Sequence, residues 1–124
     1  MKDGKYLILC VDDDGDIREA MRLRLNKAGY LTETALSAEE GLKKFKACQP
    51  DLIIVDLMME EIDSGAGLVK ELKLAGNKAP VLLLSSLGDS LSVSTSTREM
   101  GWDAVFQKPV NFEALLRTIK ARLG

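Results

Sequence analysis

Histidine is absent from this chain, and cysteine occurs only twice, at Cys10 and Cys48. Two cysteines do not make a disulfide framework, and no group of cysteine and histidine is spaced for zinc. These absences exclude a disulfide-stabilised extracellular domain and a zinc site. They favour a reducing, cytoplasmic setting.

A basic excess and a long apolar run are also missing. The 17 Lys and Arg residues are balanced by 19 Asp and Glu residues, which leaves a net charge of −2. Without a basic field, the chain has no means of holding nucleic acid or an anionic membrane surface by counterion release. The apolar stretches are far shorter than a membrane span. We therefore expect no nucleic acid and no membrane as a partner of this domain.

The 124 residues, 46% of them hydrophobic, suit one compact domain, and we see no internal repeat or linker that would divide residues 1–124. Apolar runs of strand length alternate with helical patterns, which is typical of an α/β fold with a parallel sheet. Five strand–helix units fit the chain. The predicted strands are Tyr6–Val11, Leu31–Ala35, Leu52–Val55, Val81–Leu84 and Ala104–Phe106.

The helices between these strands have their own start and stop signals. Asp14 is a good N-cap for a helix over about Gly15–Ala28, and Ser37 with Glu40 forms a capping box for the next helix, which Pro50 stops. A third helix is predicted over roughly Ala66–Leu74. The last helix has an apolar face at helical spacing, made of Phe112, Leu115, Leu116, Ile119 and Leu123. A fourth helix is doubtful, because residues 91–97 are mostly hydroxyl residues that form helices poorly, and we expect that segment to be loosely held.

Polar residues follow the apolar runs directly. Asp12 and Asp13 follow the first run, and Asp56, Ser85 and Lys108 follow or lie just beyond the third, fourth and fifth. Because the carboxyl ends of parallel strands lie at one edge of the sheet, where ligands bind in such folds, we expect these groups in one cleft.

Three neighbouring carboxylates repel one another unless a cation is present. Oxygen ligands without histidine or cysteine select a hard divalent ion, and Mg²⁺ is the usual choice where a phosphoryl group completes the coordination. With the charge neutralised, an aspartate can attack phosphorus while Lys108 and the Ser85 hydroxyl hold the phosphoryl oxygens. The sequence therefore predicts a site that forms an aspartyl phosphate.

These motifs together resemble the receiver domain of bacterial response regulators, over the whole chain. The resemblance implies a doubly wound, flavodoxin-like three-layer α/β fold with strand order 2-1-3-4-5. It implies Asp56 as the phosphoacceptor, Asp12 and Asp13 as the acidic pair with Asp13 a direct Mg²⁺ ligand, and the Met58 carbonyl as a further ligand.

The resemblance also assigns roles around the phosphoryl group and outside the domain. Ser85 is the hydroxyl residue that follows the phosphate, the Ser86 amide is another donor, and Lys108 is the essential cation. Such a domain catalyses only its own phosphorylation and slow dephosphorylation. Its partners are a sensor histidine kinase or phosphotransfer protein and a downstream target or fused output domain.

The chain departs from the receiver pattern at two places. Glu60 stands where a proline is common, and Ser64 is inserted before Gly65, so the loop after Asp56 should differ in shape and be more acidic. The aromatic residue usual three positions before the lysine is Val105, while Phe106 should point to the opposite face of the sheet. We therefore do not expect switching through a rotating aromatic ring.

Slow loss of the phosphoryl group is expected. Met58 and Leu87 match positions that flank the path of attacking water in receivers, and neither side chain can orient a water molecule by a hydrogen bond. The decay of the phosphorylated protein, followed by mass, checks this, and a half-life of seconds would contradict it.

Three other functions fit parts of the pattern. The run from Asp12 to Asp16 is similar to the nucleophile motif of haloacid-dehalogenase-type phosphohydrolases, with Asp12 as nucleophile and Asp14 as general acid, but Asp16 replaces the expected threonine. A flavodoxin-type FMN carrier has the same topology, but the aspartates after the first strand would repel the phosphate of FMN. A receiver fold that binds partners without phosphorylation is the third alternative.

Overall fold

A computed structural model describes residues 4–56, 64–85, 103–107 and 110–123 of the chain. Its five strands form one sheet of order β2-β1-β3-β4-β5, and every neighbouring pair is parallel. The order and the parallel pairing match the prediction. The strands are β1 (Leu7–Val11), β2 (Leu31–Ala35), β3 (Leu52–Asp56), β4 (Val81–Ser85) and β5 (Ala104–Gln107).

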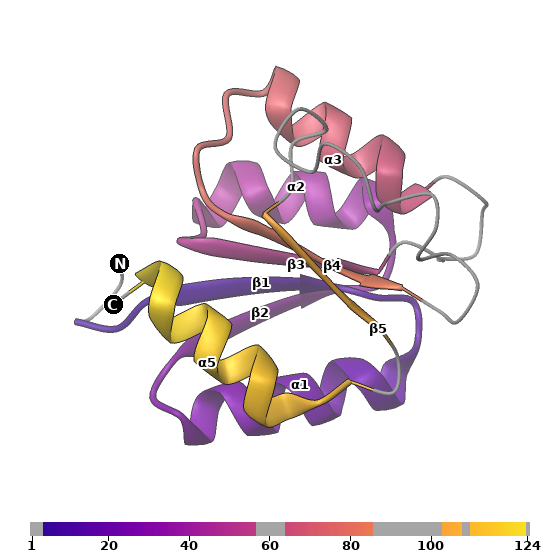
Figure 1. Ribbon diagram of the computed structural model, residues 1–124. Helices are drawn as coiled ribbons and strands as arrows, with labels where there is room; N and C mark the ends of the chain where they lie inside the picture. Colours follow the sequence, from indigo (N-terminus) through magenta and orange to yellow (C-terminus); the bar gives the residue numbers. More distant parts are fainter. Residues whose placement is uncertain (1–3, 57–63, 86–102, 108–109, 124) are drawn as a thin grey trace.

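Helices cover both faces of the sheet and make three layers (Figure 1). Helices α1 (Gly15–Lys27) and α5 (Phe112–Leu123) lie on one face, and α2 (Ala38–Cys48) and α3 (Ser64–Leu74) lie on the other. The start of β1 and the end of α5 lie near each other on the same side of the molecule. The doubtful fourth helix and the hydroxyl-rich segment 91–97 fall outside the described residues.

The core consists of two apolar clusters, one on each face of the sheet. Successive strand residues point to opposite faces, so Leu9 and Val55 pack under α2 and α3, while Ile8 and Ile54 pack under α1 and α5. All residues of β1, β3 and β4 are buried. Continuous apolar runs are therefore the pattern of these central strands, since helices cover both of their faces.

The helix starts follow the capping signals closely. The Asp14 carboxylate accepts hydrogen bonds from the amides of Asp16 and Ile17 at 2.9 and 3.4 Å. The Ser37 hydroxyl accepts from the Glu40 amide at 3.1 Å. The Glu40 carboxylate reaches back one residue further than a capping box requires and accepts from the Leu36 amide at 3.0 Å. Both N-caps were predictable, and the Leu36 partner was not.

Two helix details differ from expectation, while the end of α2 agrees with it. Helix α2 ends at Cys48, before Pro50 as predicted, and its C-cap residue Gln49 adopts a left-handed conformation with φ 49°. Helix α3 begins at Ser64 instead of near Ala66. On α5, Leu115 and Ile119 are fully buried, but the other predicted core residues pack against the cluster while only partly buried; these are Phe112, Leu116 and Leu123.

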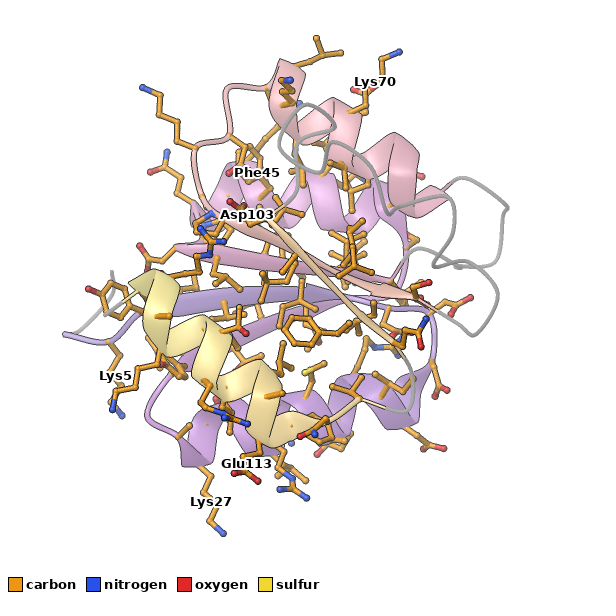
Figure 2. The ribbon with its side chains drawn as sticks, viewed as in Figure 1. Lys5, Lys27, Phe45, Lys70, Asp103 and Glu113 are labelled. Atoms are coloured by element: carbon orange, nitrogen blue, oxygen red, sulfur yellow. The ribbon has the colours of Figure 1, made fainter. Side chains whose placement is uncertain are left out.

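Two aspartates form hydrogen bonds between neighbouring strands at the edge of the sheet where the strands begin. Asp51 donates its amide to the Leu7 carbonyl at 2.7 Å, and its carboxylate accepts from the Leu7 amide at 2.8 Å. Asp103, labelled in Figure 2, makes the same pair of bonds with Val81 at 2.7 and 2.9 Å. Asp51 thus ties β1 to the start of β3, and Asp103 ties β4 to the start of β5, each pair of strands in register at this edge.

Gly41 brings α2 into close contact with β1, and we predict that Gly41→Ala destabilises the protein. A Cβ atom at Gly41 would lie 2.9 Å from Val11 Cγ2 and 3.2 Å from Leu68 Cδ2, both in the buried core. Overpacking costs about 1–3 kcal/mol, and alanine regains about 1 kcal/mol as a better helix former, so we expect a net loss of up to about 2 kcal/mol. Denaturant unfolding measures it.

Gly15→Ala is the matched control for this prediction, because Gly15 also lies in a helix but an added Cβ there would meet only Arg18 Nη2, at an ordinary 3.5 Å. We expect no loss of stability from that substitution. Equal stabilities for the two variants would contradict the close approach of α2 and β1.

Candidate functional site

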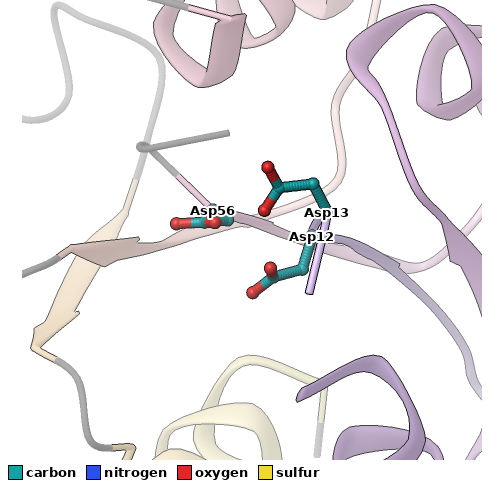
Figure 3. Close-up of side chains that lie close together, drawn as sticks. All are labelled: Asp12, Asp13 and Asp56. Atoms are coloured by element: carbon teal, nitrogen blue, oxygen red, sulfur yellow. The ribbon is translucent and has the colours of Figure 1, made fainter. Parts of the chain in front are cut away.

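Three carboxylates lie together where β1 and β3 end. Asp12 and Asp13 follow β1 directly, and Asp56 is the last residue of β3. Because β1 and β3 are adjacent, with Val11 paired with Val55, Asp12 and Asp56 are neighbours at the carboxyl edge of the sheet. One carboxylate oxygen from each of the three residues lies within 4.8 Å of the others (Figure 3). The predicted juxtaposition is therefore present.

Burial makes this cluster electrostatically costly. Asp12 and Asp56 are 0% and 1% exposed, while Asp13 faces solvent. Taking carboxylates out of water disfavours their charge unless opposite charge or hydrogen bonds compensate. A cation placed among the three oxygens would supply that compensation. The donor set is oxygen alone, which fits a hard divalent ion such as Mg²⁺.

Hydrogen bonds to backbone fix Asp12 in this cluster. Its amide donates to the Ala35 carbonyl of β2 at 3.0 Å, and its carboxylate accepts from the Asp14 amide at 2.9 Å. Since Asp14 also caps α1, hydrogen bonds hold the turn between β1 and α1 at both of its ends. The position of the Asp12 side chain is thus set by the strand before it and the helix after it.

Ser85 lies beside Asp56 on the next strand. Leu84 of β4 is paired with Asp56, so Ser85, the last residue of β4, lies one position beyond the carboxylate along the edge. Its side chain is buried. A hydroxyl residue therefore flanks Asp56 on one side and the acidic pair flanks it on the other.

Two predicted site residues, Lys108 and Met58, lie outside the described residues, as do Ser86, Leu87 and Glu60. The described part of β5 ends at Gln107, which pairs with Ser85 at the same edge of the sheet. The predicted roles of Lys108 and Met58 stay predictions.

The two residues that the sequence analysis assigned to opposite faces of β5 do lie there. Val105 packs with the cluster under α2 and α3, and Phe106 packs with the cluster under α1 and α5. The predicted placement of Phe106 on the face of β5 opposite Val105 is therefore confirmed.

Arg18 lies near the site and was not predicted from the sequence. Its guanidinium donates a hydrogen bond to the main-chain carbonyl of Asp12 at 2.7 Å. A basic residue one turn into the helix that follows the acidic pair was a visible signal, but its partner depends on the direction of a long side chain.

A cavity of about 460 Å³ lies at the edge of the sheet where the strands begin. Its lining includes Phe45 and Pro50 on one side and Asn77, in the turn before β4, on the other. It is far along the strands from the carboxylate cluster and contributes nothing to it.

A family model describes the chain as a whole. The model of the response regulator receiver domain matches residues 8–120, which include all three clustered aspartates and every strand but the first residue of β1. The chain belongs to the response regulator receiver domain family.

Curated relatives and solved structures agree with this family. The receiver domain is 35% identical over 116 residues to the response regulator MprA of Mycobacterium leprae, covering 94% of this chain and 50% of that protein. It is also 35% identical over 119 residues to the probable transcriptional regulator ycf27 of Guillardia theta, covering 96% and 46%. The chain thus spans about half the length of these relatives.

Among solved structures, the chemotaxis protein CheY4 of Vibrio cholerae is similar to this receiver domain with a TM-score of 0.86 and 30% identity, over 97% of this chain and 100% of that one. A CheY-like receiver domain protein of Methanospirillum hungatei has a TM-score of 0.85 and 32% identity, over 97% and 94%. In both comparisons, the matched region covers nearly the full length of this chain and of the compared chain.

The family gives the class of function. This receiver domain is a phosphoacceptor module of two-component signalling, and receiver domains bind Mg²⁺ in an acidic pocket of the kind seen here. The haloacid-dehalogenase, FMN-carrier and phosphorylation-independent alternatives are not favoured. In the part of the chain that the structure describes, no helix has the length and apolarity to cross a membrane.

Proposed function

We propose that Asp56 is the residue that accepts the phosphoryl group. A carboxylate oxygen of Asp56 forms a bond to phosphorus while the P–N bond of a partner's phosphohistidine breaks, and the released imidazole nitrogen takes up a proton. The observation that supports this choice is the place of Asp56 between the Asp12–Asp13 pair on one side and Ser85 on the other.

The acidic cluster would hold Mg²⁺ through Asp12, Asp13 and Asp56, with the Met58 carbonyl predicted as a further ligand. When bound, the ion neutralises carboxylate charge and stabilises the charge that develops on the phosphoryl oxygens. Asp13, which is exposed, supplies its carboxylate from the solvent side, and the two buried aspartates supply theirs from the sheet.

The remaining groups act on the phosphoryl oxygens. The Ser85 hydroxyl would donate a hydrogen bond to one of them, and the Lys108 ammonium would balance the charge of another. Ser85 is supported by its position next to Asp56 on β4. Lys108 is supported by the sequence alone.

We propose the class of protein that supplies the phosphoryl group and the class of protein that responds to it. A sensor histidine kinase or a phosphotransfer protein would supply the phosphoryl group, and a downstream protein or an attached output domain would respond. The curated relatives are about twice as long as this chain, whereas the CheY4 structure is covered over its whole length, so both arrangements occur among similar proteins. Residues 1–124 would form one receiver domain, and a cytoplasmic location remains a prediction from the sequence.

Acetyl phosphate tests this function without the kinase. Intact mass after incubation with Mg²⁺ should show one phosphoryl adduct, which is absent when the metal is chelated. No adduct on a protein that binds Mg²⁺ would favour an interaction module that works without phosphorylation. Rapid consumption of the donor without an adduct would favour a hydrolase.

A further inference from the structure

We propose that Arg18 is a positioning residue that fixes the Asp12–Asp13 peptide and thereby sets the affinity of the acidic cluster for Mg²⁺. This inference rests on the magnesium site of the proposed function. Its physical basis is one hydrogen bond, from Arg18 Nη1 to the Asp12 carbonyl oxygen at 2.7 Å.

Arg18 is well placed to hold this carbonyl. It lies in the first turn of α1, where its amide donates to the Asp14 carbonyl at 3.0 Å. Its side chain is half-buried and reaches back past the start of the helix to the end of β1. A short bond between a charged donor and a carbonyl is stronger than a neutral one, so the contact can define the local backbone.

The carbonyl of Asp12 and the amide of Asp13 belong to one planar peptide group. The Asp12 amide is held by the Ala35 carbonyl at 3.0 Å, and the Asp12 carbonyl is held by Arg18 at 2.7 Å. With both sides of Asp12 fixed, the direction in which the chain leaves toward Asp13 is fixed as well. Asp13 is exposed, so no core packing surrounds it, and its backbone direction is what brings its carboxylate within 4.8 Å of Asp12 and Asp56.

The positive charge of Arg18 lowers the affinity of the cluster for Mg²⁺, whereas its hydrogen bond raises that affinity. A guanidinium near the cluster repels Mg²⁺, and because the Arg18 side chain is only half-buried, water and salt screen that repulsion. Residues that orient metal ligands change the affinity by roughly 10–100-fold when they are replaced. Positioning is therefore the larger effect, and removal of Arg18 should weaken Mg²⁺ binding.

The experiment is calorimetric titration of the metal-free protein with Mg²⁺, which needs no phosphodonor. Arg18→Met keeps the length of the side chain and removes the donor, and we expect the dissociation constant to rise about tenfold. Arg18→Lys keeps a cation that can donate a hydrogen bond, on a shorter side chain, and we expect an intermediate dissociation constant. Thermal unfolding without metal should change little in either variant, which separates positioning from loss of structure.

Arg22→Met is the matched control. Arg22 lies one turn further along α1 in an exposed ion pair with Glu19, whose carboxyl has its pKa lowered below the usual value by the hydrogen bond from Arg22. We expect wild-type affinity for Mg²⁺ in this variant.

Several results would overturn the inference. These are an unchanged or tighter dissociation constant in Arg18→Met, an Arg18→Lys variant as weak as Arg18→Met, or an equal loss in Arg22→Met. Failure of the wild-type protein to bind Mg²⁺ would contradict the magnesium site of the proposed function, and the positioning role with it. Binding by wild type with no effect of Arg18→Met contradicts the positioning role alone.

Discussion

Replacing Asp56 by asparagine will abolish stable phosphorylation of this receiver domain. The amide has the shape of the carboxylate but no anionic oxygen that can form an acyl phosphate. Asp56 ends the central strand β3 and is 1% exposed, so the isosteric change should leave the packing around it intact. Intact mass after incubation with Mg²⁺ and acetyl phosphate should show no adduct in Asp56→Asn.

Asp12→Asn is the comparison that makes this result specific. Asp12 contributes one of the three clustered carboxylate oxygens, and it is as buried as Asp56. We expect Asp12→Asn to form the adduct more slowly, because it weakens the metal site without removing the acceptor. A normal adduct in Asp56→Asn together with complete loss in Asp12→Asn would contradict our assignment and favour Asp12 as nucleophile.

Mg²⁺ will stabilise the wild-type domain strongly, and Asp13→Asn will lose most of this effect. A ligand present at about one hundred times its dissociation constant stabilises the folded state by about 2.7 kcal/mol. For a chain of this size, that corresponds to a rise in Tm of roughly 10 °C. Asp13 brings its oxygen within 4.8 Å of the two buried carboxylates, so an amide in its place removes one anionic ligand.

Without metal, Asp13→Asn should not lower the stability of the folded domain. Asp13→Asn would relieve repulsion among three like charges, so the metal-free variant should be as stable as wild type or slightly more stable. Asp16→Asn is the control, because Asp16 lies in the first turn of α1 and is not one of the clustered carboxylates. A thermal shift by Mg²⁺ that is equal in wild type and Asp13→Asn would contradict the proposed ligand set.

The parts of the site that could be predicted from sequence are those that the strands position. Asp12, Asp56 and Ser85 follow or end buried apolar runs, and a parallel sheet brings such ends to one edge regardless of loop detail. The caps of α1 and α2 were predictable for a similar reason. Asp14 and Ser37 satisfy backbone amides within their own helices, so their partners are near in sequence.

The parts that could not be predicted depend on conformations that residue type does not determine. Gln49 ends α2 in a left-handed conformation, which glycine or asparagine would have indicated and glutamine does not. Ser64 and Gly65 are typical of loops, so the start of α3 was placed too late. The bonds from Glu40 to Leu36 and from Arg18 to Asp12 depend on how long, flexible side chains turn.

The most direct test of the central claim is to locate the phosphoryl group on the wild-type protein. Borohydride reduces an aspartyl phosphate to homoserine, and peptide mapping by mass then identifies the modified position. After incubation with Mg²⁺ and acetyl phosphate, we predict homoserine at position 56 and at no other aspartate. Homoserine at position 12, or no homoserine on a protein that carries the adduct, would contradict Asp56 as the phosphoacceptor.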